Sequence, residues 1–146
     1  MQPRDDAIGR AIARGVARAG PAMAANFIHP DWVMSAEEFR AFWGPTRLAA
    51  VGTSSPDGHP HSAPVEVDLT GDRFVIPTFA NTLRLVDLRA NSRVVLTAWD
   101  GPYHAAIVYG LVELHEASAG LVPVSVRPTR IYAIRAPAGH HAHRAH

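Results

Sequence analysis

The sequence FVIPTFANTLRLVDLRANSRVVLTAW, residues 74–99, decides the fold of this chain. It reads as a strand, a polar turn that opens a short helix, and a second strand. Four polar side chains gather where that helix begins: Thr78, Asn81, Thr82 and Arg84. Free backbone N–H groups at a helix N-terminus, hydroxyls and a guanidinium can together hold a phosphate group. The stretch therefore predicts a binding site, and it contains no obvious catalytic group.

The composition is typical of one globular domain. The chain has 146 residues, 47% of them hydrophobic, which is enough for one core, and nothing indicates a second. All 14 lysine and arginine residues are arginine, so a Schiff-base lysine is excluded. The absence of cysteine excludes disulfides, thiol nucleophiles and thiolate metal sites. Because the formal net charge is only +1, we expect no nucleic-acid partner.

The N-terminal segment predicts an amphipathic helix over residues 5–19, which the pair Gly20-Pro21 ends. Its two faces carry Ile8, Ile12 and Val16 on one side, and Arg10, Arg14 and Arg18 on the other. A helix packed on the domain or on its partner is favoured over a targeting or membrane-surface helix. No apolar run approaches the roughly 18 residues that span a bilayer, so we expect a cytoplasmic protein without a membrane partner.

The middle of the chain predicts short strands. After a capping box at Ser35–Glu38, the hydrophobic period changes to two. The predicted strands cover residues 48–53, 61–69, 73–77, 93–99, 103–113, 121–126 and 130–135, with Gly110 as a candidate bulge. Tight turns join them, which excludes a parallel α/β fold because parallel strands need long crossover connections. Antiparallel strands around one internal helix predict a closed or partly closed barrel, since closure removes exposed edges.

Three segments carry a family resemblance: LAAVGTSSPDGHPHSAPVEVDLTGDRFVIPT at residues 48–78, NTLRLVDLRANSRVVLTAW at 81–99, and the strand at 103–114. They resemble the pyridoxamine 5'-phosphate oxidase-like split β-barrel family, whose members bind FMN or a deazaflavin. Residues 130–133 resemble the last strand of that family. The resemblance implies a mainly β (α+β) fold, a six- to seven-stranded antiparallel split β-barrel with a short internal helix and N-terminal helices. It also implies a homodimer with the cofactor between subunits.

The resemblance further implies a set of cofactor-binding residues. Thr82 and Arg84 match the hydroxyl and the basic residue that hold the cofactor phosphate, and Thr78 matches a phosphate or ribityl contact. The backbones of residues 64–66 and 76–77 resemble the walls against which the flavin ring lies. The full predicted set is Pro64, Val65, Glu66, Ile76, Pro77, Thr78, Asn81, Thr82, Arg84 and Trp99. An isoalloxazine needs a flat apolar slot and a phosphate needs charge-assisted donors, which this set can offer.

Several single residues have more than one interpretation. Leu83 stands where the family often has a second basic residue, and Asp87 where it often has an asparagine. The predicted phosphate site thus loses one cation and gains one anion, unless Arg84 or Arg89 screens Asp87. A barrel that has lost its cofactor is therefore an alternative. Trp99 also suits the core or a dimer interface, where aromatic side chains are common.

The histidines offer few candidates for catalysis or metal binding. His104, early in the fifth predicted strand, is the candidate general acid or base beside a flavin. His59 and His61 share one strand face, but no third ligand is evident, so we predict exposed side chains and no metal site. The histidine-rich tail at residues 137–146 is expected to be disordered, with only adventitious metal binding.

The sequence thus predicts a homodimeric barrel that binds FMN, or alternatively a deazaflavin coenzyme. Such a protein transfers hydride through the flavin to or from a small organic substrate and needs no acidic or nucleophilic side chain of its own. The alternatives are a non-catalytic flavin- or haem-binding barrel and an interaction module without cofactor. The expected organisation is an N-terminal helical arm at residues 1–44, the barrel at 45–136 and the tail at 137–146.

Overall fold

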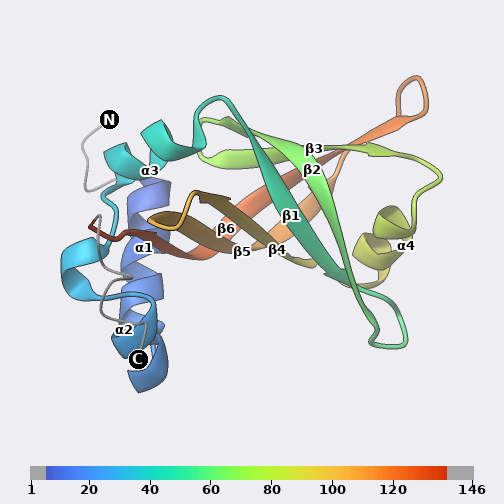
Figure 1. Ribbon diagram of the computed structural model, residues 1–146. Coiled ribbons are helices and arrows are strands. Elements are labelled where there is room, and N and C mark those ends of the chain that lie inside the picture. Colours follow the sequence, from blue (N-terminus) through green and yellow to red (C-terminus); the bar gives the residue numbers. More distant parts are fainter. Residues whose placement is uncertain (1–5, 138–146) are drawn as a thin grey trace.

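A computed structural model describes residues 6–137 of the chain, which form a six-stranded barrel with helices around it (Figure 1). The strands are β1 (Thr46–Ser54), β2 (Pro60–Thr70), β3 (Arg73–Phe79), β4 (Arg93–Asp100), β5 (His104–Leu114) and β6 (Leu121–Arg135). They close in the order β1-β2-β3-β6-β5-β4, and every pair is antiparallel. The predicted mainly β class and the predicted antiparallel barrel are confirmed.

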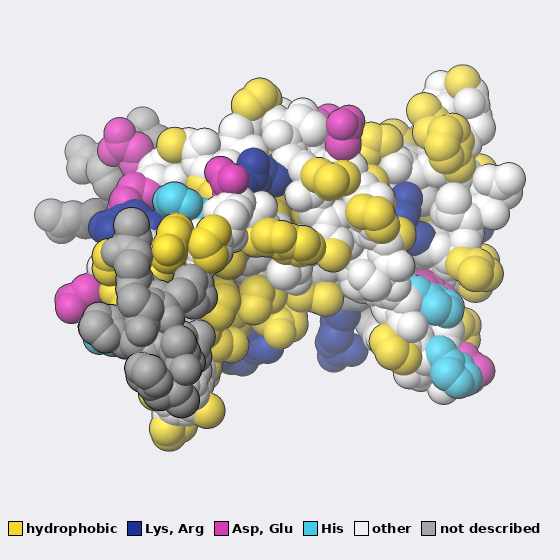
Figure 2. Space-filling view, viewed as in Figure 1, with side chains coloured by type: hydrophobic (Ala, Val, Ile, Leu, Met, Phe, Trp, Pro, Cys, Tyr) yellow, Lys and Arg dark blue, Asp and Glu magenta, His cyan; other side chains and the backbone are white. Residues whose placement is uncertain are grey.

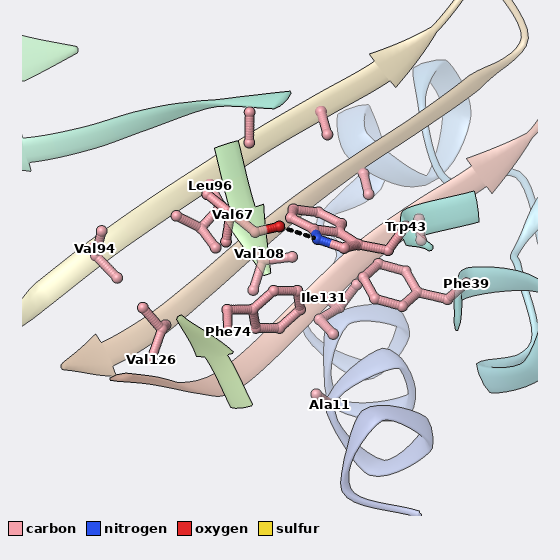
Figure 3. Close-up of a cluster of buried hydrophobic side chains, with 14 of the residues drawn as sticks. Ala11, Phe39, Trp43, Val67, Phe74, Val94, Leu96, Val108, Val126 and Ile131 are labelled. Carbon is pink, nitrogen blue, oxygen red and sulfur yellow. Dashed lines mark hydrogen bonds between the residues drawn. The ribbon is translucent and has the colours of Figure 1, made fainter. Parts of the chain in front are cut away.

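Alternation along each strand fills the barrel with apolar side chains. On β3, Phe74 and Ile76 are fully buried and point inward, while the intervening Val75 is only half-buried. Figure 3 shows inward-pointing side chains from several strands meeting in one cluster, among them Val67 and Leu96. Burying each such side chain contributes about 1.5–3 kcal/mol, so the cluster is the main source of stability.

Helices close the two ends of the barrel (Figure 1). At one end lie α1 (Ala7–Arg18), α2 (Pro21–Asn26), the 3₁₀ turn η2 (Pro30–Trp32) and α3 (Ala36–Trp43). From α3, Phe39 and Trp43 enter the core, and Trp43 Nε1 donates a hydrogen bond to the carbonyl oxygen of Val67 at 3.0 Å (Figure 3). At the other end lies α4 (Leu83–Ala90), which buries Leu85, Asp87 and Leu88.

The helix boundaries follow local capping chemistry. The predicted capping box is confirmed: Ser35 Oγ accepts from the Glu38 amide, and the Glu38 side chain accepts from the Ser35 amide. Asp6 caps α1, which ends before Gly20-Pro21 as predicted, and the unpredicted α2 begins at that proline. No helix within residues 6–137 is both long and apolar enough to cross a membrane. Residue 5 of the predicted first helix and residues 138–146 of the predicted tail lie outside the described range.

The last strand differs from the prediction. Residues 121–126 and 130–135 were expected as two strands, but they belong to one continuous strand, β6. The register between β5 and β6 shifts at Tyr109 and Gly110, because Thr129 is an extra residue between Pro128 and Arg130. The irregularity predicted at Gly110 is therefore present at that level of the sheet, but the extra residue lies on β6, opposite Gly110, and not on β5. Gly110 permits it, since a Cβ atom there would lie 2.8 Å from the carbonyl oxygen of Arg127.

Candidate functional site

The N-terminus of α4 is the starting point of the candidate site. Thr82 is the N-cap: its Oγ1 accepts from the Leu85 amide at 3.4 Å and donates to the Phe79 carbonyl at 3.0 Å. Asn81, which the sequence also places at the start of this helix and which is an equally suitable cap by residue type, is not the cap. It is an exposed turn residue, because the helix begins after Thr82 and the threonine hydroxyl reaches the third amide.

Arg84, on the first turn of α4, is a half-buried cation. Its Nε lies 3.5 Å from Oγ1 of Thr78, which is fully buried and donates to the Ile76 carbonyl. Desolvation by burial lowers the pKa of Arg84 below its ordinary value, although the guanidinium stays charged at neutral pH. Among residues 6–137 no carboxylate pairs with it. Its remaining donors are therefore available to an anion.

Asp87, one turn further along α4, has partners that the sequence did not indicate. It is 1% exposed, and its Oδ2 accepts from Thr53 Oγ1 at 2.7 Å and lies 2.6 Å from His61 Nδ1. The sequence left open that Arg84 or Arg89 pairs with this carboxylate. Neither arginine does so, and its partners are Thr53 and His61. Burial by itself raises the pKa of Asp87, but the hydrogen bonds from Thr53 and His61 outweigh burial and hold the pKa below its usual value.

The Asp87 carboxylate links α4 to the barrel, so its removal has a predictable effect. Because the pKa is lower in the folded than in the unfolded chain, the carboxylate stabilises the fold above about pH 4 and loses this effect as the pH falls through its folded pKa. We expect Asp87→Asn to cost about 1–3 kcal/mol at pH 7 and to reduce the loss of stability between pH 5 and 3. Urea unfolding at several pH values measures both effects. An unchanged pH slope would contradict this role.

His61 is the residue through which this network reaches the surface. It is the first inward-facing residue of β2, and its side chain is 40% exposed. With Nδ1 on Asp87, Nε2 is the ring nitrogen left for a ligand. His59 does not join it, because its Nδ1 lies 3.1 Å from Asp57 in the preceding turn. The described part of the chain has no cluster of three metal-ligating side chains.

Two open pockets meet at His61. The first, the α4 pocket, has a volume of about 520 Å³ and is lined by Val51, Thr53, Pro60, His61, Ser62, Ala63, Thr82, Leu83 and Arg84. The second, the sheet pocket, has a volume of about 730 Å³ on the outer face of the barrel; it shares Thr53, Pro60, His61 and Ser62, and adds Gly52, Ser54, Arg93, Val94, Val95, Tyr109 and Arg130. Volumes of this size are typical of small-molecule and cofactor sites.

The structure brings some of the predicted site residues together and leaves others apart. Thr82 and Arg84 line the α4 pocket, and Thr78 contacts Arg84. The other predicted residues do not line this pocket. Val65 packs against the core, Ile76 is buried inside the barrel, and four are exposed: Pro64, Glu66, Pro77 and Asn81. Trp99 is 63% exposed. It lies five residues along β4 from Val94, which lines the sheet pocket, and the two residues are therefore about 16 Å apart.

His104, the candidate acid or base, lies on β5 at the end opposite α4. It is paired with Asp100 on β4, stacks on Phe42 at 6.4 Å between ring centroids, and lines a separate pocket of about 280 Å³. The α4 pocket of this chain therefore does not contain it. Sequence reasoning also missed the bond between His61 and Asp87, although the alternation His61, Ala63, Val65, Val67 already placed His61 on the inner face of its strand.

Comparison with known proteins bears on this arrangement. The model of the family described as pyridoxamine 5'-phosphate oxidase matches residues 35–144. No curated protein matches the sequence significantly. A solved structure of a conserved hypothetical protein from Mycobacterium tuberculosis aligns with a TM-score of 0.68 and 20% identity, over 73% of this chain and 88% of that one.

Two other solved structures have informative names. A protein named F420 reductase aligns with a TM-score of 0.57 and 21% identity, over 63% of this chain and 94% of that one. HupZ from Group A Streptococcus aligns with a TM-score of 0.54 and 18% identity, over 64% and 90% of the two chains. At such identities the likeness shows a shared fold.

Proposed function

Because the chain belongs to the pyridoxamine 5'-phosphate oxidase family, we propose that it binds FMN in the α4 pocket and acts as an oxidoreductase on a small organic substrate. The observation that carries this proposal is Arg84, a half-buried cation without a carboxylate partner among residues 6–137, beside the N-cap Thr82. When bound, FMN supplies hydride transfer at its ring.

The residues of the pocket suit a phosphate group. The guanidinium of Arg84 offers charge-assisted donors, Thr82 offers a hydroxyl, and the first amides of α4 lack partners within the helix. Asp87 does not oppose a phosphate directly, because its carboxylate is buried and bonded to Thr53 and His61. Arg84 alone would thus bind the phosphate for which the family often uses two basic residues, since the second position is occupied by Leu83, which is apolar and 69% exposed.

The flavin ring would lie beside β2. Ala63 lines the α4 pocket and Val65 follows it on the same face of the strand, so Val65 is the part of the predicted wall at residues 64–66 that continues the pocket, whereas Pro64 and Glu66 face the other side. His61 would face the ligand with Nε2 and can donate or accept a proton there, with its ring held by Asp87. This places the acid or base of our proposal at His61 rather than at His104.

The outer face of the barrel supports the homodimer in this proposal. Trp99 and Leu48 are 63% and 64% exposed, and the register of β1 on β4 places them at the same level of neighbouring strands. Exposed apolar patches of this kind mark protein interfaces. A cytoplasmic location, the helical arm at residues 1–44, the barrel at 45–136 and the tail at 137–146 are parts of the same proposal.

The proposal is tested by the spectrum and the thermal stability of the purified protein. We expect a flavin absorbance spectrum or, for apoprotein, a rise in Tm with FMN, because a ligand at 100 times its Kd stabilises the fold by about 2.7 kcal/mol. Deazaflavin and haem are tested in parallel; a larger shift with deazaflavin selects the coenzyme suggested by the F420 reductase neighbour. No chromophore and no shift with any of the three would reject cofactor binding and leave the interaction module.

A further inference from the structure

Four arginines surround a second polar pocket, away from α4. This arginine pocket has a volume of about 270 Å³ and is lined by Arg14 and Arg18 of α1 and by Arg127, Thr129 and Arg130 of β6. No carboxylate lines it. Figure 2 shows dark-blue basic side chains along the lower edge of the molecule, between the N-terminal helices and α4, with no magenta acidic side chain between them. The pocket therefore carries a concentrated positive charge.

The four guanidinium groups have no counter-charge within the described part of the chain. None of them takes part in an ion pair. Arg14 Nε donates to the carbonyl oxygen of Thr129, and Arg130 lies 4.3 Å above the ring of Tyr109. The Nε of Arg130 is buried without a hydrogen-bond partner. An unpaired buried donor is costly, yet the Arg130 guanidinium is held in place without an acceptor from residues 6–137, and its charge adds to that of the other three arginines around the pocket.

Two features of the fold bring these arginines together. The extra residue Thr129 reverses the alternation of β6, so that Arg127 and Arg130 face the same outer side although they are three positions apart. On the opposing helix, Gly15 allows α1 to approach β6 closely, since a Cβ atom there would lie 2.1 Å from the carbonyl oxygen of Ile131. The same approach carries Arg14 and Arg18, one turn apart, to the pocket.

From this arrangement we propose that the arginine pocket binds a small molecule with a diphosphate group. Arginine forks bind phosphate oxygens in pairs, and four of them balance a ligand of three to four negative charges. A single phosphate carries about −1.5 to −2, so two phosphates match the pocket better than one. Arg130 lines both this pocket and the sheet pocket, but the arginine pocket shares no lining residue with the α4 pocket, so the proposal stands whether or not the α4 pocket binds FMN.

The test uses inorganic diphosphate and the full chain. We expect diphosphate to raise Tm and to bind in calorimetry, more strongly than phosphate or sulfate at equal ionic strength, and more weakly as salt is added. ADP is titrated in parallel: tighter binding than that of diphosphate assigns an organic diphosphate, and weaker binding assigns the inorganic ion. Equal affinity for sulfate and diphosphate would overturn the proposal, because it would show only general attraction of anions.

Two variants locate the site. The side chains of Arg18 and Arg127 make no hydrogen bond or ion pair among residues 6–137, so Arg18→Gln and Arg127→Gln should keep the fold and its Tm without ligand. Each is expected to raise the Kd for diphosphate about tenfold. Arg89→Gln removes an equal charge from the exposed face of α4 and serves as the matched control, with unchanged affinity. Retained affinity in Arg18→Gln and Arg127→Gln, together with a loss in Arg84→Ala, would place diphosphate in the α4 pocket and reject this site.

Discussion

Replacing Trp43 by alanine is expected to lower the free energy of unfolding by about 4 kcal/mol. The indole is 1% exposed, packs edge-on against Phe74 with ring centroids 4.8 Å apart, and stacks on Phe39 at 5.8 Å. Its loss leaves a cavity where α3 closes the barrel and leaves the carbonyl of Val67 without its side-chain donor. Urea unfolding measures the effect as a lower midpoint with little change in slope.

Two further variants separate the causes of this loss. Trp43→Phe keeps most of the ring packing and loses the hydrogen bond, so we expect it to cost about 1–2 kcal/mol. Phe42→Ala changes the neighbouring aromatic residue, which is only half-buried beneath Arg47, and should cost less than Trp43→Ala. If Phe42→Ala and Trp43→Ala lower the free energy of unfolding equally, burial of the indole is not the cause of the loss.

Arg84→Ala is expected to weaken FMN binding about 30-fold while changing riboflavin binding less than about threefold. The difference arises because riboflavin lacks the phosphate that Arg84 would contact, and a hydrogen bond to a charged group contributes about 1.5–3 kcal/mol. Among residues 6–137 the substitution removes one long side-chain hydrogen bond, of 3.5 Å to Thr78, so the fold should be preserved. Flavin fluorescence quenching gives both dissociation constants.

The matched control for Arg84 is on the same helix. Arg89 lies on the last turn of α4 and is exposed, so Arg89→Ala removes an equal charge without touching the α4 pocket. We expect its FMN and riboflavin affinities to remain those of the unchanged protein. If Arg84→Ala weakened both ligands equally, Arg84 would act through the shape of the pocket rather than on a phosphate.

Much of the fold could be predicted from the sequence, because it is encoded locally. Alternating apolar residues gave the positions of β1 to β5, and the pattern Ser35 to Glu38 gave the start of α3. The family resemblance seen in the sequence is confirmed by the family model. The single strand β6 was missed because Arg127-Pro128-Thr129 interrupts the alternation, and a bulge that restores pairing depends on Gly110 of another strand.

The site was harder to predict, because its contacts join distant parts of the chain. Asp87 was read against its neighbours Arg84 and Arg89, but its partners Thr53 and His61 are 34 and 26 residues away. The arginine pocket likewise joins α1 to β6: Arg14 and Arg18 could be assigned only to the polar face of the first helix, and nothing in the sequence linked them to Arg127 and Arg130. Trp99 and His104 lie far along their strands from the α4 pocket, a separation that only the register reveals.

The closed strand order also sets how this chain must fold. Strand β1 pairs with β4, and β3 pairs with β6, and in both cases more than about forty residues separate even the nearest partners, such as Gly52 with Val95 and Phe79 with Leu121. The entropy of closing those loops is lost before the pairs can form. Refolding should therefore take milliseconds to seconds, as in other β proteins with many long-range contacts. The two hairpins β1–β2 and β4–β5 can form before β1 pairs with β4 and β3 pairs with β6.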